Sequence, residues 1–274
     1  ATFRTVDVVG LDTLVHVANG IFDNCTDDER LELFKLPGFI NTMMENKWLG
    51  SKTGQGFYKK SKDEKGTTEI LTLDLDTMDY RSKKSAKFAT LELTKTIDKV
   101  VDRFSVLVDG KDKAGEFYRK SFGQLFAYVS HRIPEITDEL YKIDDAMKAG
   151  FGWEHGPFQI WDAVGLDKGL EFIKAEGLKA AEWVHEMKAS DKDSFYAIKE
   201  GNTYFYDIPS KSMEKIPGQD AFIILDNIRK SKEVFKNSGV VVEDLGDGIL
   251  NVEFQSKMNT IGGDVLAGLN KAID

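Results

Sequence analysis

Four histidines are the first candidates for chemistry in this sequence, because a histidine oriented by a carboxylate can act as a general base near neutral pH. Glu154 and His155 are adjacent, but neighbouring side chains in a loop do not naturally face each other. His16, His131 and His185 fall within helical patterns, so we interpret them as surface or packing residues. No metal-binding cluster forms around any of the four. The sequence therefore predicts no catalytic residue and no metal site.

Paired aspartates are the second candidates, and they belong to a repeat. The stretch FRTVDVVGLD, which starts at Phe3, returns from residue 158 as FQIWDAVGLD. Asp7 then corresponds to Asp162, and Asp12 to Asp167. Two carboxylates suggest acid–base work, yet equivalent positions in two separate units do not converge on one substrate. We instead expect turn stabilisation and helix capping, worth about 1 kcal/mol each, after a tight glycine turn.

Glycine pairs are the third candidates, because a dinucleotide site uses a G-x-G-x-x-G turn between a strand and a helix. Three stretches have the first two glycines and lack the third: Gly54-Gln55-Gly56, Gly150-Phe151-Gly152 and Gly246-Asp247-Gly248. We interpret them as turns and helix caps, with Gly150 in the position that favours a helix C-cap. No cofactor-binding residue is predicted.

Composition excludes several classes of protein. The 274 residues hold 46 acidic and 37 basic side chains, a net charge of -9, which argues against a nucleic-acid surface. A single cysteine, Cys25, forms no internal disulfide and no zinc site, so we expect a reducing, cytoplasmic location. No apolar run approaches the roughly 18 residues of a membrane span. Residue 1 is Ala, and we expect the natural start to lie upstream.

Apolar stripes at helical spacing predict most of the elements that would position these residues. Helices are expected after Asp12, after Pro37, over 93–104, 118–129, 136–150 and 170–184, near 222–235, and from 263 to the end. A charged, exposed loop is expected over 59–66. Extended segments are expected in TEILTLDLDTMDYR, in two strands around residues 200–202, and in a hairpin that turns at 246–248.

Three stretches resemble segments of known families. KIDDAMKAGFGWEHGPFQIWDAVGLD, from Lys142, resembles the entry to the C-terminal helical domain of 3-hydroxyacyl-CoA dehydrogenases, and KTGQGFY, from Lys52, resembles the segment that closes that domain. DLGDGILNVEFQSKMNTIGGDVLAGLNKAID, from Asp244, looks like the first hairpin and helix of an enoyl-CoA hydratase, or crotonase, domain. The resemblance implies a mainly α fold: two tandem helical bundles of the 6-phosphogluconate-dehydrogenase C-terminal-like type, plus a short, truncated α/β crotonase-like segment.

The domain limits follow from the same resemblance. Residues 1–58 would be a first, N-terminally truncated helical domain, 59–85 a linker with an extended segment, 86–193 the second helical domain, 194–238 a connector, and 239–274 the start of a hydratase domain.

The resemblance implies a role in fatty-acid β-oxidation. The parent protein would oxidise 3-hydroxyacyl-CoA to 3-oxoacyl-CoA with NAD, and a fused half would hydrate 2-enoyl-CoA. In this family NAD and a His–Glu dyad belong to an upstream domain, so this chain alone is expected to be inactive and to bind no cofactor. The alternative is a noncatalytic helical interaction or dimerisation module descended from such enzymes.

The resemblance also implies ligands and partners. In crotonase-like domains the loop after the first strands lies near bound CoA, which makes Lys257, Met258 and Asn259 substrate-binding candidates, with the lysine meeting a phosphate. The alternative is a solvated loop with one buried apolar residue. Expected partners are an acyl-CoA, the protein's own nucleotide-binding domain, and a second copy through an exposed apolar face.

Overall fold

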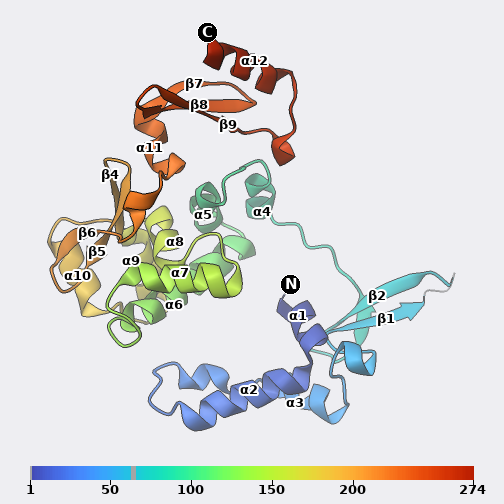
Figure 1. Ribbon diagram of the computed structural model, residues 1–274. Helices are drawn as coiled ribbons and strands as arrows, with labels where there is room; N and C mark the ends of the chain where they lie inside the picture. Colours follow the sequence, from blue (N-terminus) through green and yellow to red (C-terminus); the bar gives the residue numbers. More distant parts are fainter. Residues whose placement is uncertain (1, 63–65) are drawn as a thin grey trace. The chain divides into compact units, whose positions relative to one another are not determined.

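The protein divides into two compact units, residues 1–86 and 87–274, in a computed structural model that describes residues 2–62 and 66–274 (Figure 1). The described chain is about half helical and carries three small antiparallel sheets of three strands each. In each sheet the strands follow their order along the sequence, and neighbouring strands are antiparallel.

The first unit is a small helical assembly that ends in a sheet. Its core is formed by Leu11, Ile40, Met43, Phe57 and Leu73. Its elements are α1 (Thr2–Val9), α2 (Leu11–Asn24), η1 (Leu31–Phe34), α3 (Gly38–Glu45), η2 (Ser51–Thr53), β1 (Tyr58–Lys62), β2 (Thr68–Leu73) and β3 (Tyr80–Ser82).

The sheet of the first unit occupies part of the stretch expected to be a linker. In the predicted exposed loop over 59–66, residues 59–62 belong to β1, and residues 63–65 lie outside the described residues. β1 pairs with β2, with Tyr58 opposite Thr72, and the backbone N–H of Leu73 donates to the carbonyl of Phe57 at 2.9 Å. Leu73 and Phe57 are buried in one core, which joins the sheet to the helices.

No single helix among residues 2–62 and 66–274 is long and apolar enough to cross a membrane. Only α1 and α2 taken together are long and apolar enough, and a 99° bend separates them.

The second unit begins with seven helices, followed by a sheet. The central helix α6 is capped by Asp112, whose carboxylate accepts the backbone N–H groups of Ala114 and Gly115. The elements are α4 (Ala89–Thr94), α5 (Val100–Asp109), α6 (Lys113–His131), α7 (Leu140–Phe151), α8 (Pro157–Val164), α9 (Leu166–Ala175), α10 (Glu182–Ala189), β4 (Tyr196–Lys199), β5 (Asn202–Asp207) and β6 (Ser212–Lys215).

Three helix predictions over residues 93–184 differ from the structure. The stripe over 93–104 is divided between α4 and α5, and the stripe over 170–184 between α9 and α10, where Gly177 takes a positive φ of 70°. The C-cap of α7 is Gly152 (φ 64°, ψ 28°) rather than Gly150, which lies inside the helix. Apolar spacing continued across both breaks, so it could not locate them.

The chain ends in a third small sheet and a helix, which share a core of Val240, Val242 and Val265. The predicted hairpin turns at Gly246–Gly248 as expected, and the last helix is also confirmed. The preceding helix is shorter than predicted, because residues 233–236 form a strand. The elements are η3 (Gln219–Ala221), α11 (Leu225–Lys232), β7 (Glu233–Lys236), β8 (Val240–Gly246), β9 (Ile249–Phe254), η4 (Lys257–Asn259) and α12 (Gly263–Ile273).

Candidate functional site

The two copies of the repeated stretch build the same corner between two helices. Gly10 (φ 113°, ψ 131°) joins α1 to α2, and Gly165 (φ 100°, ψ 135°) joins α8 to α9. Each glycine N–H donates to the carbonyl four residues earlier, that of Val6 at 2.7 Å and that of Trp161 at 2.8 Å. Because an L side chain rarely adopts such positive φ, the predicted tight glycine turn is confirmed in both places.

Asp12 and Asp167 do not cap the helices that they begin. The glycine occupies the N-cap position in both corners, with no side-chain cap hydrogen bond, so the capping prediction was wrong. Asp12 instead pairs with Lys52, and Asp167 with Lys188. The hydrogen bond from Lys52 lowers the pKa of Asp12 below its usual value. Both pairs are exposed to solvent, which makes them weak surface contacts rather than a reactive site.

Asp7 and Asp162 share one role, which is to fix the first strand of a sheet to a helical corner. The two oxygens of Asp7 accept the backbone N–H groups of Phe57 and Tyr58, both at 2.8 Å. Those of Asp162 accept the N–H groups of Phe195 at 2.8 Å and Tyr196 at 2.9 Å. We call these contacts the aspartate clamps. They satisfy backbone donors, so structural stabilisation rather than acid–base chemistry explains both carboxylates.

The second clamp continues into a buried network that sequence reasoning missed. The Tyr196 hydroxyl donates to Asp144 Oδ2 at 2.8 Å, and Asp144 also accepts the N–H groups of Phe158 (2.9 Å) and Gln159 (3.0 Å). Burial raises the pKa of Asp144 to about 6, against the opposing effect of these donors, and burial likewise raises the pKa of Asp162 to about 6. The signal available in the sequence was a charged residue placed within the apolar stripe of α7.

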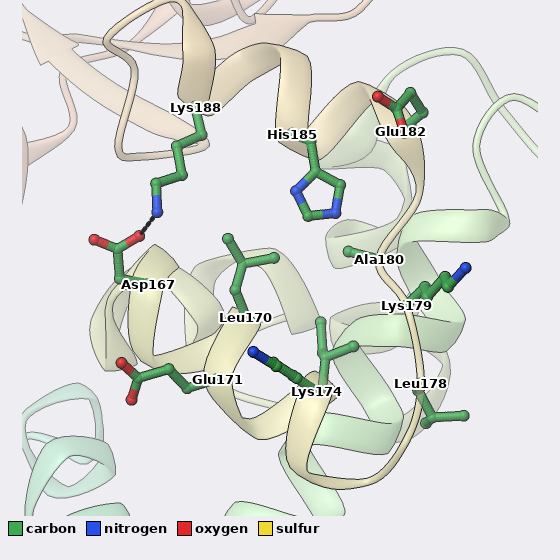
Figure 2. Close-up of a pocket in the computed structure, with 11 residues that line it drawn as sticks. Asp167, Leu170, Glu171, Lys174, Leu178, Lys179, Ala180, Glu182, His185 and Lys188 are labelled. Carbon is green, nitrogen blue, oxygen red and sulfur yellow. Dashed lines mark hydrogen bonds and ion pairs between the residues drawn. The ribbon is translucent and has the colours of Figure 1, made fainter.

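A hollow of about 540 Å³ opens between α9, α10 and the segment that joins them (Figure 2). Lys174 and Leu170 of α9 lie opposite His185 and Lys188 of α10. Its charged lining is mixed and consists of Asp167, Glu171, Lys174, Lys179, Glu182, His185 and Lys188. Among the described residues no hydrogen bond or ion pair joins His185 to a carboxylate, so the hollow lacks an oriented base.

The other histidines also lack the geometry of a catalytic dyad. His155 Nε2 lies 3.7 Å from Glu154 Oε1, so the two neighbours do approach each other, contrary to expectation, but beyond hydrogen-bonding distance. His16 is exposed on α2, and His131 Nε2 lies 3.1 Å from the carbonyl of Lys179. Within the described residues no group of three or more His, Cys, Asp or Glu side chains could hold a metal ion.

The glycine pairs do not fit a nicotinamide dinucleotide. Gly54 ends η2 in a left-handed conformation, Gly152 caps α7, and Gly246 with Gly248 turns the β8–β9 hairpin. A pyrophosphate needs a turn that leaves a strand and opens a helix, with free N–H groups at the helix N-terminus. All three pairs serve as turns or caps, as predicted.

Lys257, Met258 and Asn259 form the short turn η4 between β9 and α12, and all three are exposed. Met258 is 91% exposed, so the alternative of a loop with one buried apolar residue is wrong. Met258 (φ 57°) and Asn259 (φ 53°) both take left-handed conformations, which carry strain in residues other than glycine. The turn therefore presents a lysine and an apolar side chain to solvent.

Comparison with known families gives this arrangement its context. The family model for "3-hydroxyacyl-CoA dehydrogenase, C-terminal domain" matches residues 1–60 and 114–197. This chain belongs to that family. Each matched segment of the dehydrogenase domain contains one glycine corner and one aspartate clamp: Gly10 and Asp7 in the first, Gly165 and Asp162 in the second.

Curated relatives carry related names. The chain is 38% identical over its whole length to a "Probable 3-hydroxyacyl-CoA dehydrogenase" of Bacillus subtilis (strain 168), of which it covers 34%. It is 23% identical over 63% of its length to a "Putative fatty acid oxidation complex trifunctional enzyme" of Rickettsia felis, covering 22% of that protein. It is 28% identical over 70% of its length to a "Fatty acid oxidation complex subunit alpha" of Psychrobacter cryohalolentis, covering 24%. The chain thus spans about a third or less of these relatives.

Proposed function

We propose that this chain is the helical part of an NAD-dependent 3-hydroxyacyl-CoA dehydrogenase of fatty-acid oxidation, with two copies of the helical domain in tandem. The observation that carries the proposal is the aspartate clamp beside the glycine corner, present in both segments matched by the family model. The name of the Bacillus subtilis relative supports this reaction class, and the name of the Psychrobacter cryohalolentis relative supports a role in fatty-acid oxidation.

In this proposal the longer protein removes a hydride from C3 of the hydroxyacyl group, passes it to NAD⁺, and gives the hydroxyl proton to a base. The described residues offer neither a dinucleotide turn nor an oriented histidine, so a domain outside this chain would supply both. The contribution of this chain would be structural, as helical walls that pack against the nucleotide-binding domain and enclose the acyl-CoA.

Spectroscopic assays at 340 nm test this assignment directly. The full-length protein, given a 3-hydroxyacyl-CoA and NAD⁺, is expected to form NADH, whereas the 274-residue chain is expected to form none. A full-length protein without this activity would contradict the dehydrogenase proposal and favour the alternative, a noncatalytic helical interaction or dimerisation module. NADH formation by the isolated chain would contradict the proposed absence of catalytic residues.

We also propose that the last residues begin an enoyl-CoA hydratase domain. Support comes from the β8–β9 hairpin, the solvent-facing turn η4 and the helix α12, which packs on the hairpin through Val265. Lys257 would then attract a CoA phosphate. In the full-length protein, Lys257→Ala is expected to raise the KM for an enoyl-CoA with little change in kcat. Lys271→Ala is a suitable control, because Lys271 also lies in this segment, on α12, where its ammonium group lies over the ring of Phe235 of β7.

Two further proposals concern the self-association of the chain and its location in the cell. We propose that the isolated chain associates with itself through its exposed apolar side chains, and that the protein works in the cytoplasm, as its single cysteine suggests. Analytical ultracentrifugation of the 274-residue chain over a range of concentrations tests the first point. A strictly monomeric chain at all concentrations would contradict it.

A further inference from the structure

Helices α1 and α2 of the first unit both expose apolar side chains. Phe3 is 48% exposed, Val9 56% and Val17 51%. Single exposed apolar residues are common, but several on one pair of joined helices mark a surface that another element covers. The chain contains its own comparison for this face, because α1 and α2 correspond to α8 and α9 of the second unit.

In the second unit two of the corresponding residues are buried, and the third, Phe172, is half-buried. Phe158 corresponds to Phe3 and is fully buried, and Val164 corresponds to Val9 and is 5% exposed. The ring centroids of Phe158 and Phe195 lie 5.1 Å apart, and those of Phe3 and Phe57 lie 4.6 Å apart. The same aromatic pair therefore lies beneath this surface in both units. In the second unit Trp183 of α10 also packs on Phe158, with ring centroids 6.0 Å apart, so α10 forms part of the cover there.

The cover in the second unit includes helix α6. At Gly123 an added Cβ would lie 2.7 Å from the carbonyl oxygen of Phe172, so α6 approaches the backbone of α9 closely. One turn further, the Phe126 ring stacks on Trp161, with centroids 4.7 Å apart and planes 6° apart. Val17 is the counterpart of Phe172, and it lies exposed on α2.

The internal repeat, which aligns Phe3 with Phe158, places the counterpart of α6 outside residues 1–60. The second matched segment starts at residue 114, in the first turn of α6, whereas residue 1 corresponds to residue 156, which immediately precedes α8. The first segment therefore matches the part of the domain that follows α7.

We infer that a helix of the α6 type, N-terminal to residue 1 in the longer protein, packs on the face of α1 and α2 that includes Val9 and Val17. This inference rests on the tandem arrangement proposed above. The covering helix needs a glycine or another small residue against the backbone at Val17, and an aromatic ring one turn later against Val6, the counterpart of Trp161.

Thiol labelling measures whether this face is covered. Cys25 is exposed and is the only cysteine, so a Cys25→Ser background allows single probes at Val9→Cys and Val17→Cys. Asn19→Cys is the control, because its counterpart Lys174 is exposed in the second unit. Maleimide labelling is compared between the 274-residue chain and the full-length protein, with folding of every variant checked by circular dichroism.

We expect both face probes to react at least about tenfold more slowly in the full-length protein, and the control to change by less than about twofold. Equal rates in the two proteins would overturn the inference, as would protection that disappears on dilution, because a second copy would then be the cover. The readout does not depend on enzyme activity. Protected probes in a protein that forms no NADH would refute the dehydrogenase assignment alone, and unprotected probes in an active dehydrogenase would refute this inference alone.

Discussion

The hydroxyl of Tyr196 donates a 2.8 Å hydrogen bond to Asp144, while its backbone N–H donates to Asp162 at 2.9 Å. One residue at the start of β4 thus contacts two aspartates from different helices, α7 and α8. Burial is the main reason that the pKa of each carboxyl is raised to about 6. This network ties the helices to the sheet of the second unit, and its stability is expected to depend on pH.

The first prediction concerns the pH dependence of unfolding. In the folded state Asp144 and Asp162 keep their protons to a higher pH than in the unfolded chain, where the pKa of an aspartate carboxyl has its usual value of 3.8. These two groups therefore stabilise the fold most below about pH 4, and their contribution is lost as the pH rises through about 6. Because the Tyr196 hydrogen bond lowers the pKa of Asp144, Tyr196→Phe is expected to raise that pKa further.

Carbon-13 NMR titration of the carboxyl groups measures this shift, and urea unfolding at several pH values measures its effect. Tyr196→Phe is expected to cost roughly 1–3 kcal/mol at pH 7 and less at pH 4. Tyr204→Phe is the control, since Tyr204 lies in the same sheet and its hydroxyl has no hydrogen bond among the described residues. An Asp144 pKa that stays the same or falls in Tyr196→Phe would contradict the prediction.

The second prediction concerns the two aspartate clamps. In Asp7→Asn, an amide NH₂ replaces one acceptor opposite a backbone N–H donor, so the variant is expected to lose roughly 1–3 kcal/mol. Faster amide hydrogen exchange should appear at Phe57, Tyr58 and Leu73, where β1 joins the helices.

Asp162→Asn should act in the same way on Phe195, Tyr196 and Tyr206. Asp193→Asn is the control, because Asp193 is exposed close to the second clamp. If Asp7→Asn and Asp162→Asn left exchange at these amides as slow as in the wild type, the carboxylates would not be holding the strands.

The third prediction compares two helical glycines. Gly123→Ala places a Cβ 2.7 Å from the carbonyl oxygen of Phe172, a backbone atom that cannot move without shifting α9. We expect a loss of roughly 1–3 kcal/mol in the free energy of unfolding. In Gly150→Ala, on α7, the added Cβ meets no other atom within 4 Å. This substitution should instead stabilise the chain by about 0.5–1 kcal/mol, because alanine favours a helix more than glycine does. Thermal unfolding of both variants checks the opposite signs, and a stabilised Gly123→Ala would show that α6 and α9 are not in close contact.

The fourth prediction concerns a buried acid in the C-terminal sheet. Glu243 is fully buried on β8, accepts a 2.9 Å hydrogen bond from Asn251, and lies 3.4 Å from the guanidinium of Arg229 on α11. Arg229→Leu leaves this carboxyl without its cation and is expected to destabilise the sheet by roughly 3–5 kcal/mol.

Amide exchange along β8 and β9 measures that effect, with the helices of the second unit as an internal reference. The double variant Arg229→Leu/Glu243→Leu is the control and is expected to recover part of the lost protection, because the fully buried carboxyl is removed together with its cation, although the partly buried Glu253 then loses this partner. A single variant that exchanges like the wild type would show that the ion pair does not stabilise the sheet.

The sequence alone predicted the local features of this fold well. The glycine corners, the final hairpin and the last helix all depend on residues close together in the chain, where turn chemistry and apolar spacing are visible. Long-range polar contacts could not be predicted in the same way. Asp12 was assigned to a helix cap, whereas its partner is Lys52 in a later segment.

Candidate-site prediction had the same limit. The repeat showed that Asp7 and Asp162 were equivalent, but not that each receives backbone N–H groups from a Phe-Tyr pair much later in the sequence. The strands β1 and β6 were missed because their sequences, YKKSK and SMEK, are mostly polar and show little alternation. Such edge strands are held by neighbouring backbone rather than by a pattern of their own.

The backbone at Gly10 and Gly165, with φ near 100° or above, has a consequence at the level of the gene. Every amino acid that a single base change can put in place of glycine carries a β-carbon, and therefore meets the same torsional barrier at these corners. Point mutation therefore offers no low-cost replacement for the glycine at either corner, and the buried Leu11 and Leu166 that follow add a packing constraint.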